Sequence, residues 1–107
     1  MTIIGNLEAL LAGGRDDAML RFGLGSAYFN SRQFDQAVPH LQICLEHDPD
    51  YSAAYKLLGK ALFKCGRNAE AKNVFTNGLP VAVRKGDKQT EREIRVFLNK
   101  LDKSLGE

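Results

Sequence analysis

The chain repeats a pattern of residue types at an interval of 34 positions. The pair Leu24-Gly25 returns as Leu58-Gly59, and each Gly is followed by Ala twelve residues later. These alanines are Ala37 and Ala71, and further matches at the same interval are Ala27 with Ala61 and Phe29 with Phe63. Such matches in a short chain indicate two copies of one structural unit. A unit of this size cannot bury its apolar face alone, so the copies are expected to stack.

Within each unit, the apolar residues are spaced as in two α-helices joined by a short turn. In the first unit the two stripes are Leu24, Gly25 and Tyr28, then Ala37, Leu41, Cys44 and Leu45. In the second unit they are Tyr55, Leu58, Gly59 and Leu62, then Ala71, Val74, Phe75, Gly78 and Leu79. Pro49 separates the units, because proline has no N–H to donate and restricts the residue before it.

Two of the repeated residues carry a cost that predicts tight packing. Gly25 and Gly59 fall in the middle of the expected helices, where glycine costs about 1 kcal/mol relative to alanine. Close approach of the second helix of each pair would offset that cost. We therefore expect each glycine to face its partner helix.

An apolar stripe at each end of the chain predicts a capping helix. The first is Ile3, Ile4, Leu7, Leu10 and Leu11, and the second is Ile94, Phe97, Leu98, Leu101 and Leu105. Gly13-Gly14 ends the first stripe. The expected fold is all-α: one domain of six helices over residues 1–107, stacked as an open solenoid. Its parts are a capping helix at 2–13, repeat one at 17–50, repeat two at 51–85 and a capping helix at 88–105.

These units resemble tetratricopeptide repeats, which are 34-residue helix–turn–helix units with a Leu-Gly pair and later Ala and Pro. The matching residues are Leu24, Gly25, Tyr28, Ala37 and Pro49, then Tyr55, Leu58, Gly59, Leu62 and Ala71. The resemblance covers residues 18–83 and is strongest to short bacterial members that stand alone, without an assigned activity. Arg21 and Val83 depart from the pattern, and Val83 in place of Pro implies that the last repeat helix runs on.

Composition restricts the class of protein. Hydrophobic residues make up 44% and charged residues 26%, as in a globular domain. No apolar run reaches the roughly 20 residues needed to span a bilayer, and the first residues lack the features of a secretion signal. The two cysteines are not closely spaced, which favours free thiols and a cytoplasmic location. Residues 1–51 hold three basic and seven acidic residues, a charge of −4, while residues 52–107 hold twelve and six, a charge of +6.

No group of residues points to catalysis or to a cofactor. His40, Cys44 and His47 share one side of a helix at a spacing that could bind zinc, but a fourth ligand is missing. We interpret them as a packed cysteine beside two solvated histidines. Cys65 has no nearby base and is interpreted as an inert thiol. The chain has no phosphate-binding loop and no nucleophile or metalloprotease motif, so no enzyme activity is expected.

Three lysines are the main candidates for binding. Lys56, Lys60 and Lys64 are four residues apart on one predicted helix face, and no acidic residue lies between them on that face. They form either a solvated surface or a stripe that attracts anions. In tetratricopeptide repeats the first helices line a concave groove, and the resemblance places these lysines there. Matching the apolar spacing of residues 55–62 to 94–101 adds Arg92 and Arg95.

The predicted function is a scaffold that binds an acidic segment of a protein or peptide in a basic concave groove. The predicted groove residues are Phe29, Lys56, Lys60, Phe63, Lys64, Arg92 and Arg95. The alternatives are a helical repeat that binds RNA and a module that assembles with itself. The expected oligomeric state is a monomer or a weak homo-oligomer. Some members of the family clamp a chaperone's C-terminal carboxylate, but that clamp needs Lys or Asn where this chain has Phe22, Ser26 and Leu57. That specific activity is therefore not expected.

Overall fold

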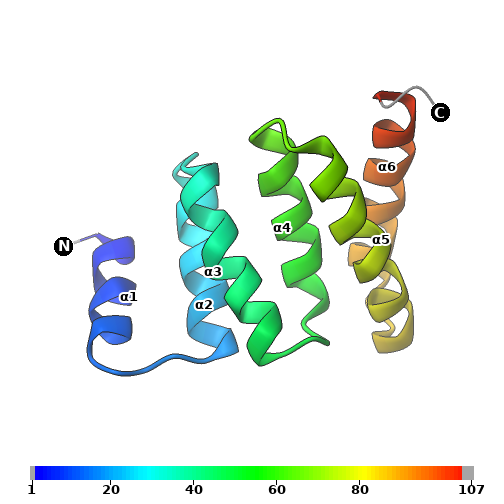
Figure 1. The fold of residues 1–107 in the computed structure, drawn as a ribbon. Helices are drawn as coiled ribbons and strands as arrows, with labels where there is room; N and C mark the ends of the chain where they lie inside the picture. The colour runs from blue at the N-terminus through cyan, green and yellow to red at the C-terminus, as the bar shows by residue number, and fades with distance from the viewer. Residues whose placement is uncertain (1, 105–107) are drawn as a thin grey trace.

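The computed structural model describes residues 2–104, which form six α-helices and no strand (Figure 1). The helices are α1 (Ile3–Ala12), α2 (Ala18–Asn30), α3 (Phe34–His47), α4 (Ser52–Lys64), α5 (Asn68–Lys85) and α6 (Lys88–Ser104). The all-α fold predicted from the repeats is confirmed for that part of the chain. Leu105, the last residue of the predicted second end stripe, lies outside the described residues.

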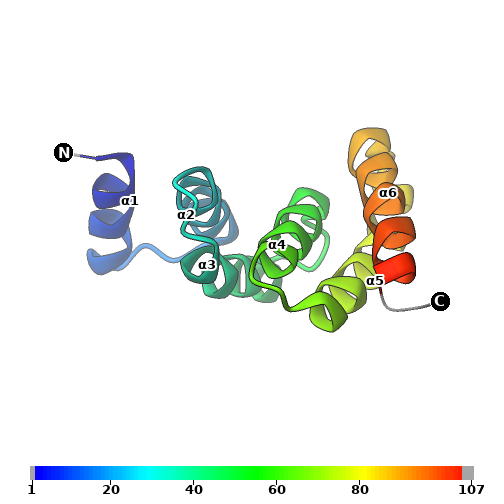
Figure 2. The same cartoon turned by 90° about the horizontal axis from the view of Figure 1, so that it is seen from above.

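The helices follow one another in a row, each running opposite to its neighbour, with the two chain ends at opposite ends of the row (Figure 1). Seen from above, α2, α4 and α6 lie on one side and α3 and α5 on the other (Figure 2). Helix α4 is set back between α2 and α6, so that side is curved inward (Figure 2). The molecule measures 46 × 28 × 19 Å, the elongated shape of a short solenoid.

The repeated glycines bring the two helices of each repeat together, as predicted. A Cβ atom on Gly25 would lie 2.5 Å from the side chain of Leu41, and one on Gly59 would lie 2.3 Å from the ring of Phe75. Only glycine leaves room for these two side chains, which are fully buried. The 34-residue interval therefore repeats one packing contact as well as a pattern of residue types.

The core is continuous from the first repeat to α6. Phe75 is fully buried and stacks on Phe97 with ring centroids 5.2 Å apart, while Phe63 meets Phe97 edge-on at 5.7 Å. Ile94 and Leu101 of α6 are also fully buried. Helix α6 therefore covers the apolar face of the second repeat, as expected of a capping helix.

The N-terminal helix covers much less. Helix α1 has no buried residue, and its Leu7 reaches α2 opposite Gly23. The ring of Phe22 in α2 does not stack on α1 but on Tyr51, just before α4, with centroids 4.8 Å apart. The two ends of the solenoid are therefore built differently.

Aspartate side chains cap the starts of α2 and α6. Asp17 accepts a hydrogen bond from the Leu20 amide at 2.8 Å, and Asp87 accepts one from the Thr90 amide at 3.1 Å. Asp87 also accepts a 2.8 Å hydrogen bond from the hydroxyl of Ser52, which ties the start of α6 to the start of α4. Hydrogen bonds from the Thr90 side chain, the Ser52 hydroxyl and the Thr90 amide lower the pKa of Asp87 below its usual range, since they favour its charged form.

The structure corrects the predicted alignment of α6 with α4. The cap residues Tyr51 and Asp87 and the buried residues Leu58 and Ile94 are each 36 positions apart, not 39. Helix α5 also runs past Val83 to Lys85, as the missing proline predicted. The apolar stripe of α6 fits both alignments, and only the packing against α4 and α5 decides between them.

Candidate binding groove

Helices α2, α4 and α6 present their free sides on the inward-curved face of the solenoid (Figure 2). Helix α4 buries Ala54, Leu58 and Leu62, so Lys56, Lys60 and Lys64 lie on the opposite part of its surface. Each of the three lysines contacts a side chain of another helix, as described below. We call the inward-curved face of α2, α4 and α6 the concave surface.

Two of the lysines lie over aromatic rings of the first repeat. The Lys60 ammonium is 5.6 Å from the centroid of Phe29, and that of Lys64 is 6.0 Å from the centroid of Phe34. The rings of Phe29 and Phe34 pack edge-on, 5.0 Å apart. An ammonium group over an aromatic face gains about 0.5–1 kcal/mol at an exposed site, which holds each lysine in position.

An acidic residue of a neighbouring helix lies among the lysines. Glu93 of α6 lies 3.1 Å from the Nζ atom of Lys56 and 4.0 Å from that of Lys60. The sequence interpretation considered only α4 itself, whereas Glu93 comes from the neighbouring first helix. Glu93 compensates part of the positive charge and joins α4 to α6 across the concave surface.

The C-terminal part of the concave surface combines apolar and basic groups. Lys100 lies over two rings at once, 5.7 Å from the centroid of Phe63 and 5.2 Å from that of Phe97. Beside them is a hollow of about 330 Å³ lined by Arg92, Glu93, Val96 and Phe97. The sequence analysis identified Phe63 and Arg92 but missed Lys100, Phe97 and Phe34. The alignment by 36 positions would have found Lys100, since it corresponds to Lys64.

One predicted groove residue lies elsewhere. Arg95 is bound to Glu91 at 3.2 Å, on its own helix. It follows Glu93 by two positions, and residues two apart in an α-helix point about 200° apart. Since Glu93 faces α4, Arg95 points away from the concave surface. Its inclusion came from the alignment by 39 positions and is corrected here.

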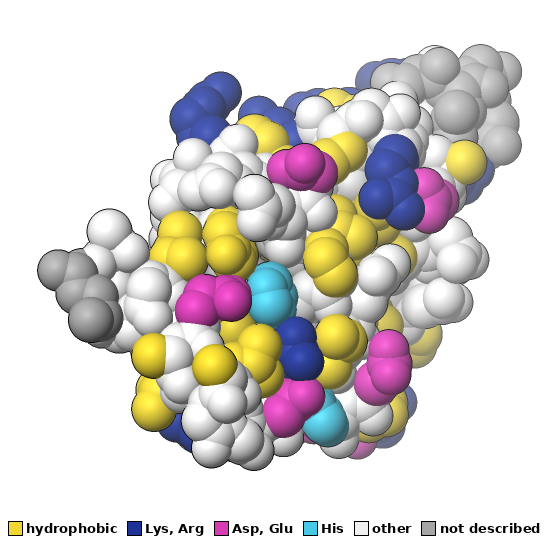
Figure 3. Space-filling model, turned by 60° about the vertical axis from the view of Figure 1, so that its left-hand side comes forward, with side chains coloured by type: hydrophobic (Ala, Val, Ile, Leu, Met, Phe, Trp, Pro, Cys, Tyr) yellow, Lys and Arg dark blue, Asp and Glu magenta, His cyan; other side chains and the backbone are white. Residues whose placement is uncertain are grey.

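The two histidines belong to a polar cluster at the other end, where acidic, basic and histidine side chains lie side by side (Figure 3). Arg21 donates to His40 Nδ1 at 3.0 Å, and Glu8 of α1 lies 3.5 Å from His40 Nε2. The His40 ring also stacks on Tyr28, with centroids 5.5 Å apart. The side chain of His40 is only 15% exposed, so its interpretation as a solvated residue was wrong.

Both charges and burial decide the protonation of this cluster. Burial lowers the pKa of His40, and Arg21 adds to this while Glu8 and Asp16 oppose it. Because guanidinium can only donate, the Nδ1 atom that meets Arg21 must accept, which requires neutral His40. Asp16 accepts from Arg21 at 2.8 Å and lies 2.9 Å from His47, and these bonds hold its pKa well below its usual range.

The cysteines differ in exposure. Cys44 is fully buried, and burial raises the pKa of its thiol to about 11. A thiol with such a pKa stays protonated at neutral pH. Cys65 is half-buried. Within the described residues, no three or more His, Cys, Asp or Glu side chains are grouped so that they could hold a metal ion.

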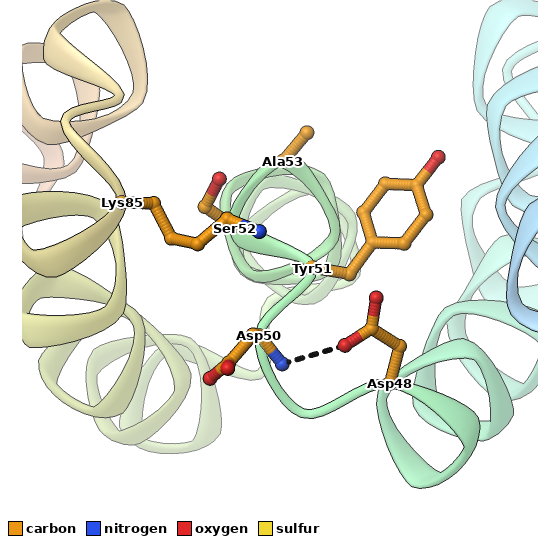
Figure 4. Close-up of a pocket in the computed structure, with 6 residues that line it drawn as sticks. All are labelled: Asp48, Asp50, Tyr51, Ser52, Ala53 and Lys85. Atoms are coloured by element: carbon orange, nitrogen blue, oxygen red, sulfur yellow. Dashed lines mark hydrogen bonds between the residues drawn. The ribbon is translucent and has the colours of Figure 1, made fainter.

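A second hollow, of about 280 Å³, lies at the connection between α3 and α4 (Figure 4). Its two carboxylates have structural partners. Asp48 accepts a hydrogen bond from the Asp50 amide at 3.0 Å, and Asp50 forms an ion pair with Arg84 of α5. The ion pair of Asp50 with Arg84 connects the end of the first repeat to α5. In residues 2–104 no helix is both long and apolar enough to cross a membrane.

Comparison with known proteins agrees with this geometry. Residues 28–83 match the family model described as tetratricopeptide repeat. A TPR repeat-containing protein of Pseudomonas aeruginosa is 49% identical over 102 residues, which cover 95% of this chain and 97% of that protein.

Solved structures share the fold. A Bordetella parapertussis protein determined in solution superposes with a TM-score of 0.82 at 44% identity, covering 97% of this chain and 90% of that one. The Sgt2 TPR domain of Aspergillus fumigatus superposes with a TM-score of 0.79 at 22% identity, covering 94% of this chain and 67% of that one. With two stacked 34-residue units, glycines that admit the second helices, and these relatives, the chain belongs to the tetratricopeptide repeat family.

Proposed function

We propose that this chain binds a short acidic segment of a partner protein along its concave surface. Tetratricopeptide repeats generally act as modules for protein–protein interaction. The acidic character of the segment is inferred from this chain's own residues. One observation carries the proposal: lysines of α4 and α6 lie in a row over aromatic rings, and the helices α2 and α4 contain no acidic residue.

The row extends over all three first helices. Lys60 and Lys64 lie over rings from α2 and α3, and Lys100 lies over rings from α4 and α6. Such an arrangement offers a ligand both charge and apolar contact, because the aliphatic part of each lysine and the edge of each ring stay accessible. A carboxylate side chain would pair with the ammonium groups while an adjacent apolar side chain meets the rings.

The position of Glu93 suggests where the charge is strongest. It offsets Lys56 and is 4.0 Å from Lys60, but no ion pair is recorded in the described structure for Lys64 or Lys100. We therefore place the acidic part of the ligand near Lys60, Lys64 and Lys100. The hollow beside Val96 and Phe97 would take an apolar side chain of the same segment.

A selection of random twelve-residue peptides displayed on phage tests this proposal. We expect the selected peptides to be rich in Asp and Glu with at least one apolar residue, and to bind more weakly as salt increases. Peptides without acidic enrichment would contradict the proposal. So would retention of the protein on RNA at physiological salt, with no peptide selected, since the same lysines would then serve a nucleic acid.

Charge-reversal variants locate the binding. The double variant Lys60→Glu/Lys64→Glu should weaken binding of a selected acidic peptide by about tenfold or more, because each exposed charge alone contributes little. The matched control is Lys85→Glu, a reversal of an exposed lysine at the end of α5. Equal affinities of the double variant and the control at low salt would show that these lysines are not part of the binding site.

A further inference from the structure

Helix α1 continues the register of the second helices α3 and α5. Counting 34 positions back from Leu41, which itself matches Phe75, leads to Leu7. The same step leads from Ala37 to Ile3 and from Cys44 to Leu10. Helix α1 therefore has the register of a second helix.

One side of α1 is exposed. In α3 the residues Ala37, Leu41 and Cys44 are fully buried. Their counterparts at the ends of α1 are open, since Ile3 is 68% exposed and Leu10 is 46% exposed. Asn6 and Ala9, which lie between them on the helix surface, are exposed as well. We call these four residues, Ile3, Asn6, Ala9 and Leu10, the N-terminal face.

The opposite end of the solenoid is closed. By the alignment of 36 positions, Arg95 of α6 takes the place of Gly59, and Glu91 takes the place of Tyr55. In α4 these are the places where α5 packs, because Gly59 admits Phe75 and Tyr55 lies against Gly78. In α6 the corresponding positions are occupied by Glu91 and Arg95, which form an ion pair at 3.2 Å. The outer side of α6 therefore has no site where another helix, such as α1 of a second copy, could pack as α5 packs on α4.

We propose that the N-terminal face is a dimer interface, in which α1 of one copy packs antiparallel on α1 of a second copy about a two-fold axis. The order of side chains makes the face complementary to itself, because an antiparallel pair sets Ile3 of one helix against Leu10 of the other. The small Ala9 and Asn6 between them permit close approach near the axis. A two-fold contact uses the same patch on both copies and closes on itself.

The charges of α1 are compatible with a second copy as the binding partner. The N-terminal face carries no charged side chain, so a second copy meets no like charge there. The only charged residue of α1, Glu8, points back to its own chain, where its carboxylate accepts from the Tyr28 hydroxyl at 3.4 Å. A head-to-tail contact between the −4 half of one copy and the +6 half of another would instead need α6, whose outer side is closed.

The size of the face sets the strength of the interface. Helix α1 has ten residues, and a pair of such helices buries less than the roughly 1,200 Å² of the smaller stable interfaces. The dimer is therefore weak and forms at high protein concentration.

Sedimentation equilibrium over a range of concentrations tests the dimer. We expect the wild type to form dimers and no larger species. The variant Ile3→Arg/Leu10→Arg should raise the dissociation constant about tenfold or more, because it places charges in the interface. The matched control Val96→Arg, which changes a residue 61% exposed on α6, should leave the dissociation constant unchanged. Circular dichroism checks that each variant keeps its helices.

A cysteine placed near the axis gives an independent reading. In a Cys65→Ser background, Asn6→Cys should form a disulfide-linked dimer on mild oxidation, since equivalent residues meet at a two-fold axis. Gln36→Cys, at an exposed position of α3, should remain monomeric under the same conditions. A wild type that stays monomeric at millimolar concentration would overturn the proposal. So would dimers that Val96→Arg disrupts and the α1 variant does not.

Discussion

At the scale of single residues, the fold depends on positions that have no side chain. The ring of Phe75 occupies the space where a side chain of Gly59 would stand, and Leu41 does the same for Gly25. Glycine in a helix costs about 1 kcal/mol, and the burial of these two side chains offsets that cost. The structural role of each glycine therefore depends on what faces it.

Substitution of two glycines by alanine separates these effects. Gly59→Ala should lower the free energy of unfolding by about 1–3 kcal/mol, because its Cβ would overlap the buried Phe75 ring. Gly23→Ala is the control, since its Cβ would lie 3.7 Å from Leu7, an ordinary contact. That variant should gain up to about 1 kcal/mol from helix propensity. Urea unfolding measures both, and destabilisation of equal size would refute the distinction.

His40 makes stability depend on pH. Its pKa is lowered in the folded state, so the unfolded chain binds the proton more readily. The neutral ring therefore contributes stability that is present above the unfolded pKa of about 6.5 and is lost as the pH falls below it. Asp16 acts in the same direction at lower pH, because its pKa is lowered too and its contribution is lost only as the carboxylate is protonated.

The variant His40→Phe tests this dependence, since a phenyl ring can still stack on Tyr28 but cannot take up a proton. The melting temperature of the wild type should fall between pH 7.5 and 5.5, and that of the variant should fall less. A decrease of equal size in both proteins would show that His40 is not the group responsible.

The sequence could not predict this cluster or the ion pairs of Glu93. The residues of the histidine cluster, Glu8, Arg21 and His40, come from three different helices, and helical spacing relates only residues of one helix. The packing of Gly59 was predictable because the repeat shows the same pair of residue types twice.

At the scale of helices, the two ends of the chain have different roles. Helix α6 buries Ile94 and Leu101 and covers Phe75 through Phe97, whereas α1 buries no residue. The apolar stripes predicted both helices but could not predict which of them buries more, since the burial of a stripe depends on the residues that it packs against. The position of α6 was predicted with the wrong alignment because residues three apart on a helix have similar directions.

Truncation of each end gives opposite results on this account. Removal of residues 88–107 should expose the Phe75 ring and cause aggregation and binding of a hydrophobic dye. Removal of residues 1–14 should leave the two repeats folded, with little dye bound. Circular dichroism and dye fluorescence measure both. Equal dye binding by the two truncated proteins would contradict the assignment of α6 as the cap.

At the scale of the whole molecule, stacking turns separate helices into one surface. The lysines of α4, Lys100 of α6 and the rings of α2 and α3 come together only because the first helices share a side (Figure 2). The family resemblance predicted that shared side, and the binding role of the seven groove residues stays a prediction. The exact set required the packed structure, as Arg95 and Lys100 show.

The most direct test is to locate the binding face by nuclear magnetic resonance. An acidic peptide from the phage selection is titrated into isotope-labelled protein, and the backbone amide signals are followed. The account predicts that the largest shifts occur in α2, α4 and α6, around Lys60, Lys64 and Phe97. Shifts confined to α3 and α5, on the other side of the solenoid, would contradict it.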